Sequence, residues 1–331
     1  MDKLTATQPQ SGSRDLAGNR TVGTRREPAE RPPSLTTSAR RPGEAVAKIL
    51  LRIAAWLTIL ITVGIVFALI VPAIEFFAEI SIVDFLFGTR WAPRFSNPSF
   101  GVIPLVTATI WTTAIALLTA VPIGLGAAVL LSEYAHRRLR AVLKPILEIL
   151  AGVPTVVYGL FALAFVQTVV LRDWLHLPTG SFSVLAAGLV MGVMIVPTVA
   201  SLSEDAMSAV PNAMRQGSAA LGANRMQTSL RVVFPAALSG IVAAIVLGIS
   251  RAVGETMIVA IAAGGQARMV TGPLQQGQTM TGFIANAALG DSRVGSIEYN
   301  TLFAVGLLLF TITLLINFIS IRFVRRFREA Y

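Results

Sequence analysis

The sequence predicts an all-α polytopic membrane protein with six transmembrane helices, and three observations lead to this prediction. Of the 331 residues, 54% are hydrophobic and only 13% are charged, with a mean hydropathy of +0.70. Soluble domains carry about 25% charged residues. Six apolar segments reach roughly 20 residues or more, the length that an α-helix needs to cross about 30 Å of hydrocarbon. Finally, Lys and Arg lie mostly on one side of these segments.

The chain begins with a polar segment, residues 1–44, which is rich in Arg, Pro, Ser, Thr and Gly and contains almost no apolar cluster. We predict a disordered cytoplasmic tail here and a transmembrane permease domain over residues 45–331. A basic segment can also tether to an anionic leaflet, which is the alternative for this tail. The apolar run that follows is too long for a signal peptide.

The third and fifth of the six spans contain the features that bear on function. Pro154 lies within the third span, and proline removes a helix hydrogen bond. The expected kink either turns Thr155 and Tyr158 towards a central cavity or is an ordinary packing kink. The glycine-rich loop after the fifth span, residues 264–300, is expected to contain irregular backbone that folds back towards the pore. The predicted spans are residues 47–71, 102–131, 146–170, 184–202, 236–263 and 301–321.

The placement of basic residues predicts the orientation of the chain in the membrane. Of the 27 Lys and Arg residues, 21 lie on the side of the two termini, five lie on the opposite side, and one is within the fifth span. Without the first 44 residues the bias is still 13 to five. The positive-inside rule therefore predicts a multi-pass protein of the plasma (inner) membrane with both termini in the cytoplasm.

Arg251 and Glu255 are the only ionisable residues between Val232 and Ala267. Each costs roughly 2.5–3.5 kcal/mol at the centre of a membrane helix. In a continuous helix Glu255 lies one turn from Arg251 and faces the same side. The two therefore either form a self-contained ion pair that braces the bundle or line a path for a polar substrate. Ser250 and Thr256 are weaker candidates for that path, because hydroxyl groups in membrane helices often bond to their own backbone.

A loop of small residues lies between the fourth and fifth spans. It predicts a short helix, a turn at a glycine, and a second helix that enters the membrane near Pro235. Small side chains allow another protein to approach closely, although a plain cytoplasmic hairpin fits the same pattern. The candidate docking residues are Gln216, Gly217, Ser218, Ala219, Ala220, Leu221 and Gly222.

This loop resembles the E-A-A-x-x-x-G-x9-I-x-L-P loop of ATP-binding-cassette importer permeases. The spacing of the glycines and the ending at Val232, Phe234 and Pro235 match that pattern. Gln216 replaces the acidic residue, and Gly217 and Ser218 replace the two alanines. The resemblance implies that the loop is the coupling helix, between transmembrane helices four and five, which docks in a groove of the ATPase subunit.

A narrower resemblance covers most of residues 80–325. Residues 251–257 (R-A-V-G-E-T-M) are similar to a signature of phosphate permeases, as are residues 151–159 and 278–281. Residues 91–93 and 100–104 resemble the C-type subunit of phosphate importers, with Ala108 where a glycine is usual. This resemblance implies three partners: a homologous A-type permease in a heterodimer, an ATP-binding-cassette ATPase dimer, and an extracytoplasmic phosphate-binding protein. It implies no cofactor in this chain, with ATP and Mg bound by the ATPase.

Phosphate chemistry agrees with the residues at membrane depth. A guanidinium is always charged and can grip two phosphate oxygens with its planar fork. Arg251 therefore suits an oxyanion, and Glu255 could accept a hydrogen bond from a protonated phosphate oxygen, which sulfate lacks. Molybdate or sulfate remains the alternative within the importer class. A channel or ion-coupled carrier, with the charged pair as a gate or proton relay, is the alternative outside it.

Other function classes find little support in the sequence. The chain has no cysteine, and neither His136 nor His176 has a second ligand at metal spacing, so we expect no metal site. It contains no G-x-x-x-x-G-K-[ST] loop and so cannot bind ATP in that way. The net charge of +10 follows from membrane orientation, and we expect no nucleic-acid partner. No nucleophile–base pair lies at membrane depth, so we expect a translocation subunit and not an enzyme.

Overall fold

The computed structural model describes residues 42–290 and 293–326. The chain forms two compact units, Met1–Ile59 and Leu60–Tyr331, and the second contains every site discussed below. The predicted disordered tail lies outside the described residues as far as residue 41, and residues 42–44 already belong to the first helix.

Helices make up most of the described chain. The long ones are α1 (Pro42–Glu79), α3 (Ile103–Val129), α6 (Val184–Ser208), α10 (Leu238–Gly254) and α13 (Ile297–Arg326). The shorter ones are α2 (Ile82–Phe87), α4 (Arg137–Gly152), α5 (Thr155–Phe161), α7 (Asn212–Ala220), α8 (Arg225–Thr228), α9 (Phe234–Ala236), α11 (Met257–Ala262) and α12 (Met280–Ala288). Three π-helical segments join them, η1 (Leu130–Tyr134), η2 (Ala162–Trp174) and η3 (Ser229–Val233). The strands β1 (Trp91–Ala92) and β2 (Ser99–Phe100) form an antiparallel pair with Trp91 opposite Phe100.

The helices confirm the predicted all-α membrane architecture. In the described chain five helices are long and apolar enough to span a membrane. A sixth span is present if Arg225–Ala236 and Leu238–Gly254, which meet at an angle of 71°, count as one. Large apolar side chains are exposed along these helices, as expected for surfaces that face lipid.

The third span differs from the prediction, because it begins at Thr155 and reaches Trp174. Residues 146–152 instead complete α4, an amphipathic helix with cationic residues in its first half. The chain leaves the helical conformation at Val153 and Pro154, where ψ is 130° and 136°. A residue before proline is disfavoured in the α conformation, so the helix breaks where a kink was expected.

The fifth span is also interrupted, so the prediction of one continuous helix over residues 236–263 was wrong. α10 ends at Gly254, Glu255 is extended with ψ of 131°, and α11 begins at Met257. At its other end α10 is separated from α9 by Ala237, where the 71° bend occurs.

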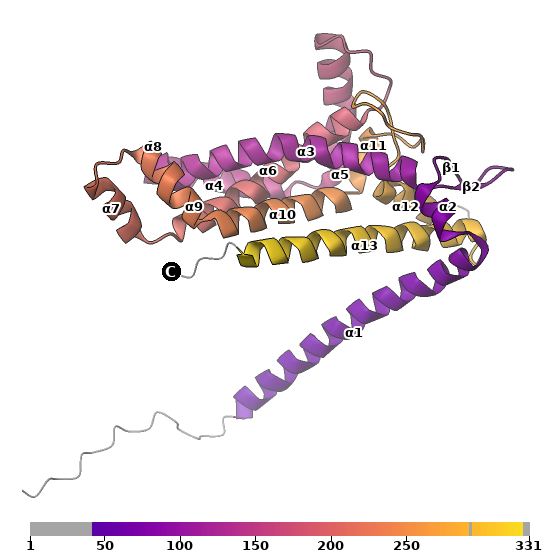
Figure 1. Cartoon of the computed structure of the whole chain (residues 1–331), viewed down its shortest axis with the longest axis horizontal. Coiled ribbons are helices and arrows are strands. Elements are labelled where there is room, and N and C mark those ends of the chain that lie inside the picture. The colour runs from indigo at the N-terminus through magenta and orange to yellow at the C-terminus, as the bar shows by residue number, and fades with distance from the viewer. Residues whose placement is uncertain (1–41, 291–292, 327–331) are drawn as a thin grey trace, which may run out of the picture. The chain divides into compact units, whose positions relative to one another are not determined.

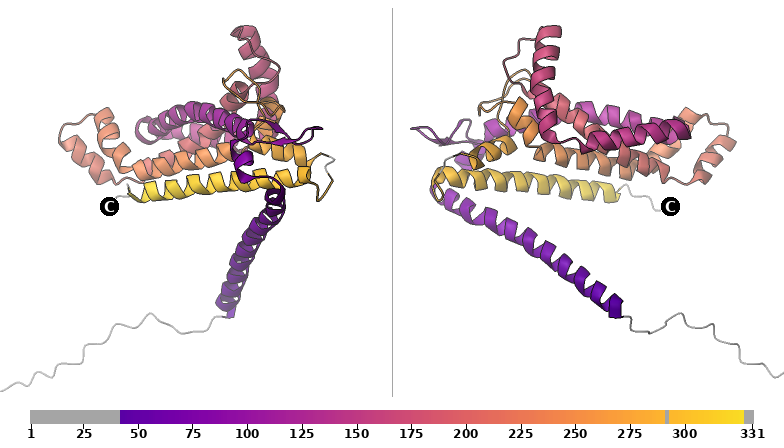
Figure 2. Two further views of the ribbon diagram at one scale, coloured as in Figure 1. Left: turned by 45° about the vertical axis from the view of Figure 1, so that its right-hand side comes forward. Right: turned by 180° about the vertical axis from the view of Figure 1, so that it is seen from behind.

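The bundle is built around close packing of α3 against α6. A Cβ atom at Gly188 of α6 would lie 2.7 Å from Cβ of Ile115, and one at Gly192 would lie 2.7 Å from Cβ of Thr119. Two glycines four residues apart therefore let the two helices approach, as small residues commonly do in membranes. α10 packs against α6, α3 and α13. Figures 1 and 2 show α7 and α8 at one end of the bundle, with β1, β2 and α12 at the other.

The segment between α11 and α12 folds back onto the bundle, as the sequence predicted. In this segment, the backbone N–H of Gly277 donates to Ala263 O at 2.9 Å, and Gln275 O accepts from the N–H of Val184 of α6 at 2.9 Å. Trp111 of α3 donates from Nε1 to Val270 O at 3.1 Å. These bonds satisfy irregular backbone that would otherwise be costly to bury.

Candidate functional site

Arg251 lies in the last turn of α10 and is half-buried. Its Nη1 donates to Thr198 Oγ1 of α6 at 3.1 Å. A guanidinium carries five N–H donors. Within the described residues the remaining donors of Arg251 have no hydrogen-bond or ion-pair partner. A cation at this depth with most of its donors unused is prepared to bind an anion.

Glu255 is buried and occupies the break between α10 and α11. Its Oε1 accepts hydrogen bonds from the backbone N–H groups of Met257 at 3.1 Å and Ile258 at 3.3 Å. The first N–H groups of a helix lack partners within it, and the helix dipole attracts a carboxylate there. The other oxygen, Oε2, accepts no hydrogen bond within the described chain.

No Arg251–Glu255 ion pair is present in the described structure, so the alternative of a self-contained brace has no support there. The i, i+4 spacing brings two side chains together only in an uninterrupted helix. Here the helix ends between the two residues, and each side chain has a different partner.

Hydroxyl groups surround the same break. Thr281 Oγ1 donates to Glu255 O at 2.7 Å and lies 3.2 Å from Thr279 Oγ1. Thr109 Oγ1 accepts from the backbone N–H of Met280 at 3.1 Å. Sequence reasoning singled out residues 278–281 only by resemblance, and it missed Thr109. The sequence marks Thr109 only as a threonine in an apolar helix, and such threonines are too common to identify a site.

The other three candidate residues, Ser250, Thr256 and Thr155, differ in their contacts. Ser250 donates to Asn317 Oδ1 of α13 at 2.9 Å, and Thr256 Oγ1 donates to Gly254 O at 3.3 Å. Thr155 is the half-buried first residue of α5. α5 approaches α11 closely, since a Cβ at Gly159 would lie 3.2 Å from Met257 O. Tyr158, one turn after Thr155, bridges the other break by donating to Leu150 O at 2.8 Å.

A second candidate site is the outer surface of α7, which contains no buried residue. The predicted short helix and glycine turn are confirmed, because α7 ends at Ala220 and Gly222 has a φ of +83°. Leu221 is 91% exposed, and Met226 is 62% exposed. Leu221 lies outside the candidate spans, so lipid does not explain its exposure. An apolar surface of this kind is typical of a docking site for another protein.

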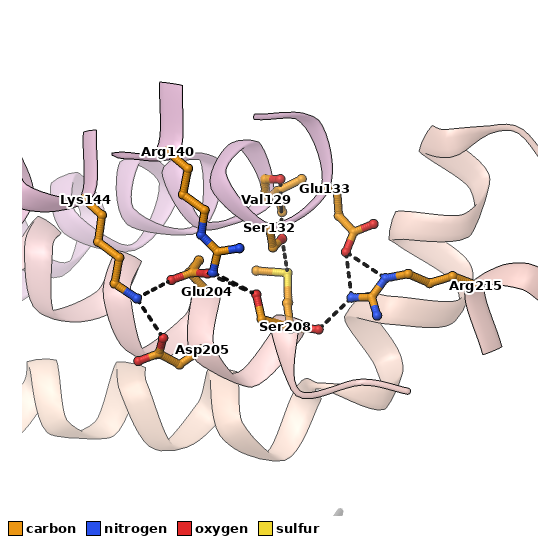
Figure 3. Close-up of polar contacts among 10 residues, drawn as sticks. Val129, Ser132, Glu133, Arg140, Lys144, Glu204, Asp205, Ser208 and Arg215 are labelled. Carbon is orange, nitrogen blue, oxygen red and sulfur yellow. Dashed lines mark hydrogen bonds and ion pairs between the residues drawn. The ribbon is translucent and has the colours of Figure 1, made fainter. Parts of the chain in front are cut away.

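Ion pairs fix α7 to the bundle (Figure 3). Arg215 of α7 pairs with Glu133 of η1, with Nη2 2.9 Å from Oε1, and also donates from Nη2 to Met207 O of α6 at 2.8 Å. One guanidinium thus links α7 both to the end of α6, which precedes it in the chain, and to η1, which lies 82 residues away in sequence.

Beside this contact, α4 is held to α6 through Glu204, whose side chain is 1% exposed. Arg140 and Lys144 of α4 both pair with it, Lys144 at 3.0 Å, and Lys144 also pairs with Asp205 at 3.1 Å (Figure 3). Hydrogen bonding to Glu204, then to Asp205, raises the pKa of Lys144 above its ordinary value of 10.5. The pairs therefore stabilise the fold throughout the neutral range, and this contribution is lost as the pH rises through the raised pKa. Sequence reasoning missed Glu204, because its partners lie about 60 residues away.

Comparison with known proteins agrees with this architecture. Residues 120–329 match the family model described as "Binding-protein-dependent transport system inner membrane component". The chain is 37% identical to the "Probable ABC transporter permease protein YqgH" of Bacillus subtilis over 73% of this chain and 79% of that protein. It is also 37% identical to the "Phosphate transport system permease protein PstC 1" of Mycobacterium tuberculosis over 69% of this chain and 73% of that protein.

A solved structure gives the same fold. A chain of a bacterial ABC transporter involved in alginate import superimposes with a TM-score of 0.54, over 80% of this chain and 96% of that chain, at 15% identity. The matched family model covers more than half of the sequence, including α6, α7, α10 and α13. The chain therefore belongs to the family of binding-protein-dependent transport system inner membrane components.

Proposed function

We propose that this chain is the permease subunit through which an ATP-driven importer moves inorganic phosphate into the cytoplasm. The observation that carries the proposal is Arg251, a cation at membrane depth with a single hydrogen-bond partner, Thr198, in the described chain. Several relatives that are 30–37% identical are named phosphate transport permeases, which supports phosphate as the substrate.

Family membership indicates which steps of transport belong to this chain and which belong to its partner proteins. The chain is a transport permease and not an enzyme, and it works with an ATPase and a substrate-binding protein in the inner membrane. ATP hydrolysis belongs to the partner ATPase, which we propose is a dimer that binds ATP and Mg. We further propose that an A-type permease forms a heterodimer with this chain, and that the substrate-binding protein is an extracytoplasmic phosphate-binding protein.

In the proposed mechanism Arg251 grips two oxygens of the phosphate ion as the path opens. The bidentate fork of a guanidinium matches these oxygens, and a partly dehydrated site strengthens the contact. Glu255 holds the helix break beside it, and its unused Oε2 accepts a hydrogen bond from the protonated oxygen of a hydrogenphosphate. Such an acceptor disfavours sulfate, which has no proton to donate at neutral pH. Thr155, Ser250 and Thr256 are proposed as further hydroxyl groups along the path.

Coupling to ATP hydrolysis is proposed to pass through residues Gln216–Gly222. Leu221 and the exposed side of α7 dock in the ATPase, and Arg215 transmits the movement to α6. α6 carries Thr198, the partner of Arg251, so one helix connects the docking site with the substrate site.

Reconstitution tests this function directly. Vesicles that contain the complete transporter and the binding protein should take up labelled phosphate only when ATP is supplied on the ATPase side. Excess sulfate or molybdate should leave that uptake unchanged. Competition by either ion would instead identify it as the substrate, and uptake that needs no ATP would support the channel or carrier class.

The orientation is proposed to place both termini and α7 in the cytoplasm, from the 13-to-five bias of basic residues. The chain lacks cysteine, so single thiols can report on it. In sealed cells an impermeant thiol reagent should label Leu289→Cys, a position that is 88% exposed after α12. It should label His136→Cys, before α4, only after the membrane is opened. The reverse pattern would refute the orientation.

A further inference from the structure

A second basic site lies at the end of the bundle opposite α7, which is the external end in the proposed orientation. It is a pocket of about 600 Å³ between the β1–β2 hairpin, the loop after α11, and α12. Three arginines line it, together with three amide side chains. These residues are Arg90, Arg94, Arg268, Gln266, Gln278 and Asn286.

The backbone that carries the arginines is fixed. Trp91, next to Arg90, packs edge-on against Phe283 of α12 with ring centroids 4.9 Å apart. Arg90 O accepts hydrogen bonds from Gly101 N at 2.9 Å and from Ser99 Oγ at 2.8 Å. Across the pocket, the N–H of Gln278 donates to Gln266 O at 3.0 Å. A site whose backbone is held in this way binds a ligand without first having to become ordered.

All the charged side chains among the described residues that line this pocket are positive. The described lining contains no carboxylate. The guanidinium groups of Arg90 and Arg268 have no hydrogen-bond or ion-pair partner among the residues that the structure describes. Basic residues are disfavoured on the external side of a membrane protein. Only five Lys or Arg residues fall on that side of this sequence, and three of them line this one pocket.

The pocket is joined to the intramembrane site by a few residues of chain. Gln278 lines the pocket, and Thr281, three residues later, donates to Glu255 O at 2.7 Å. The same short segment therefore lines the pocket and borders the break beside Arg251.

From these observations we infer that the pocket is an external binding site for inorganic phosphate, occupied before the ion reaches Arg251. The inference rests on the proposed phosphate function and adds a second phosphate-binding site to the proposed path. The guanidinium groups of Arg90 and Arg268 supply the charge, and Gln278 supplies a neutral donor, while Asn286 lies on the wall of the pocket.

The test uses Asn286→Cys, which places the only thiol of this chain on the pocket wall. In right-side-out vesicles with the complete transporter, labelling of this chain is followed by its mass. A negatively charged methanethiosulfonate should react about tenfold faster than a positively charged one of similar size, because a cleft of one sign concentrates counter-ions. Millimolar phosphate should slow the reaction, and potassium chloride at equal ionic strength should slow it much less.

Two controls make the result specific. Leu289→Cys lies just after the same helix but outside the lining, so phosphate should leave its labelling rate unchanged. Adding Arg90→Gln and Arg268→Gln to Asn286→Cys should remove both the charge preference and the protection. Adding Arg293→Gln, an exposed arginine outside the lining, should preserve both.

Equal slowing by chloride, or protection that survives the double replacement, would overturn the inference. Protection by the ligand-free binding protein but not by phosphate would also overturn it, because the pocket would then be a protein-docking surface. If the transporter takes up phosphate normally but phosphate does not slow labelling of Asn286→Cys, the pocket is not a phosphate site, and the proposed function stands. If phosphate slows the labelling but the transporter does not import phosphate, the pocket binds phosphate and the proposed function is wrong.

Discussion

Replacing Arg251 with lysine should lower phosphate uptake by about 10- to 100-fold, although the positive charge is kept. An ammonium group lacks the planar fork, so the ion loses one charge-assisted hydrogen bond, worth about 1.5–3 kcal/mol. Arg251→Gln should abolish uptake. Initial rates in reconstituted vesicles measure both effects, and co-purification of the partner subunits shows whether the transporter still assembles.

Arg231→Lys is the matched control, because it makes the same change at an exposed position of η3 and should retain parental uptake. Assembly is expected to survive Arg251→Gln, since among the residues that the structure describes Arg251 forms no ion pair whose loss would leave a buried charge. Parental uptake in Arg251→Lys would show that the fork does not hold the ion. Failure of Arg251→Gln to assemble would show that the side chain mainly supports the fold.

Glu255 provides a separate comparison at the same break. Glu255→Gln keeps a side-chain oxygen for the N–H groups of Met257 and Ile258 but removes the charge. Glu255→Ala also removes this acceptor and should cost about 0.5–2 kcal/mol of stability, as for a helix cap. A loss of uptake in both variants, with instability only in the second, would separate substrate contact from support of the helix.

Apolar length was sufficient to predict most of the fold. Four of the six predicted spans correspond to single long helices, because a long uninterrupted apolar run has few other stable structures in a membrane. Of the two that differ, one is interrupted at Pro154, which has no N–H to donate within a helix, and the other at Glu255, whose carboxylate accepts the first N–H groups of α11. Hydropathy averages over such a break and cannot detect it.

The candidate site could be predicted only in its composition. Arg251 and Glu255 stand out as charges at membrane depth, yet their relation depended on a helix that ends between them. The bonds of Glu255 to α11 favour that ending. The partners Thr198 and Thr281 lie 53 and 26 residues away, so no local spacing indicates them. Arg90, Arg94 and Arg268 are likewise brought together only by the tertiary fold.

Placing a tryptophan at Ala219 should abolish transport while the protein remains in the membrane. Ala219 is exposed on α7, so the permease itself can accommodate the larger side chain. The ATPase could not, if this surface seats in its groove, and co-purification of the ATPase should fall together with uptake. Ala78→Trp, at an exposed position near the end of α1, should change neither.

Leu221 allows the same docking site to be tested by removal instead of obstruction. Burial of a leucine side chain contributes about 1.5–3 kcal/mol, so Leu221→Ser should weaken binding of the ATPase by about 10- to 100-fold. Stability of the isolated permease should not change, since the side chain is 91% exposed there.

Gly222→Val adds a third case, because a φ of +83° strains any β-branched residue and should disturb the turn after α7. Parental transport in Ala219→Trp together with parental ATPase affinity in Leu221→Ser would place the coupling site elsewhere in the chain.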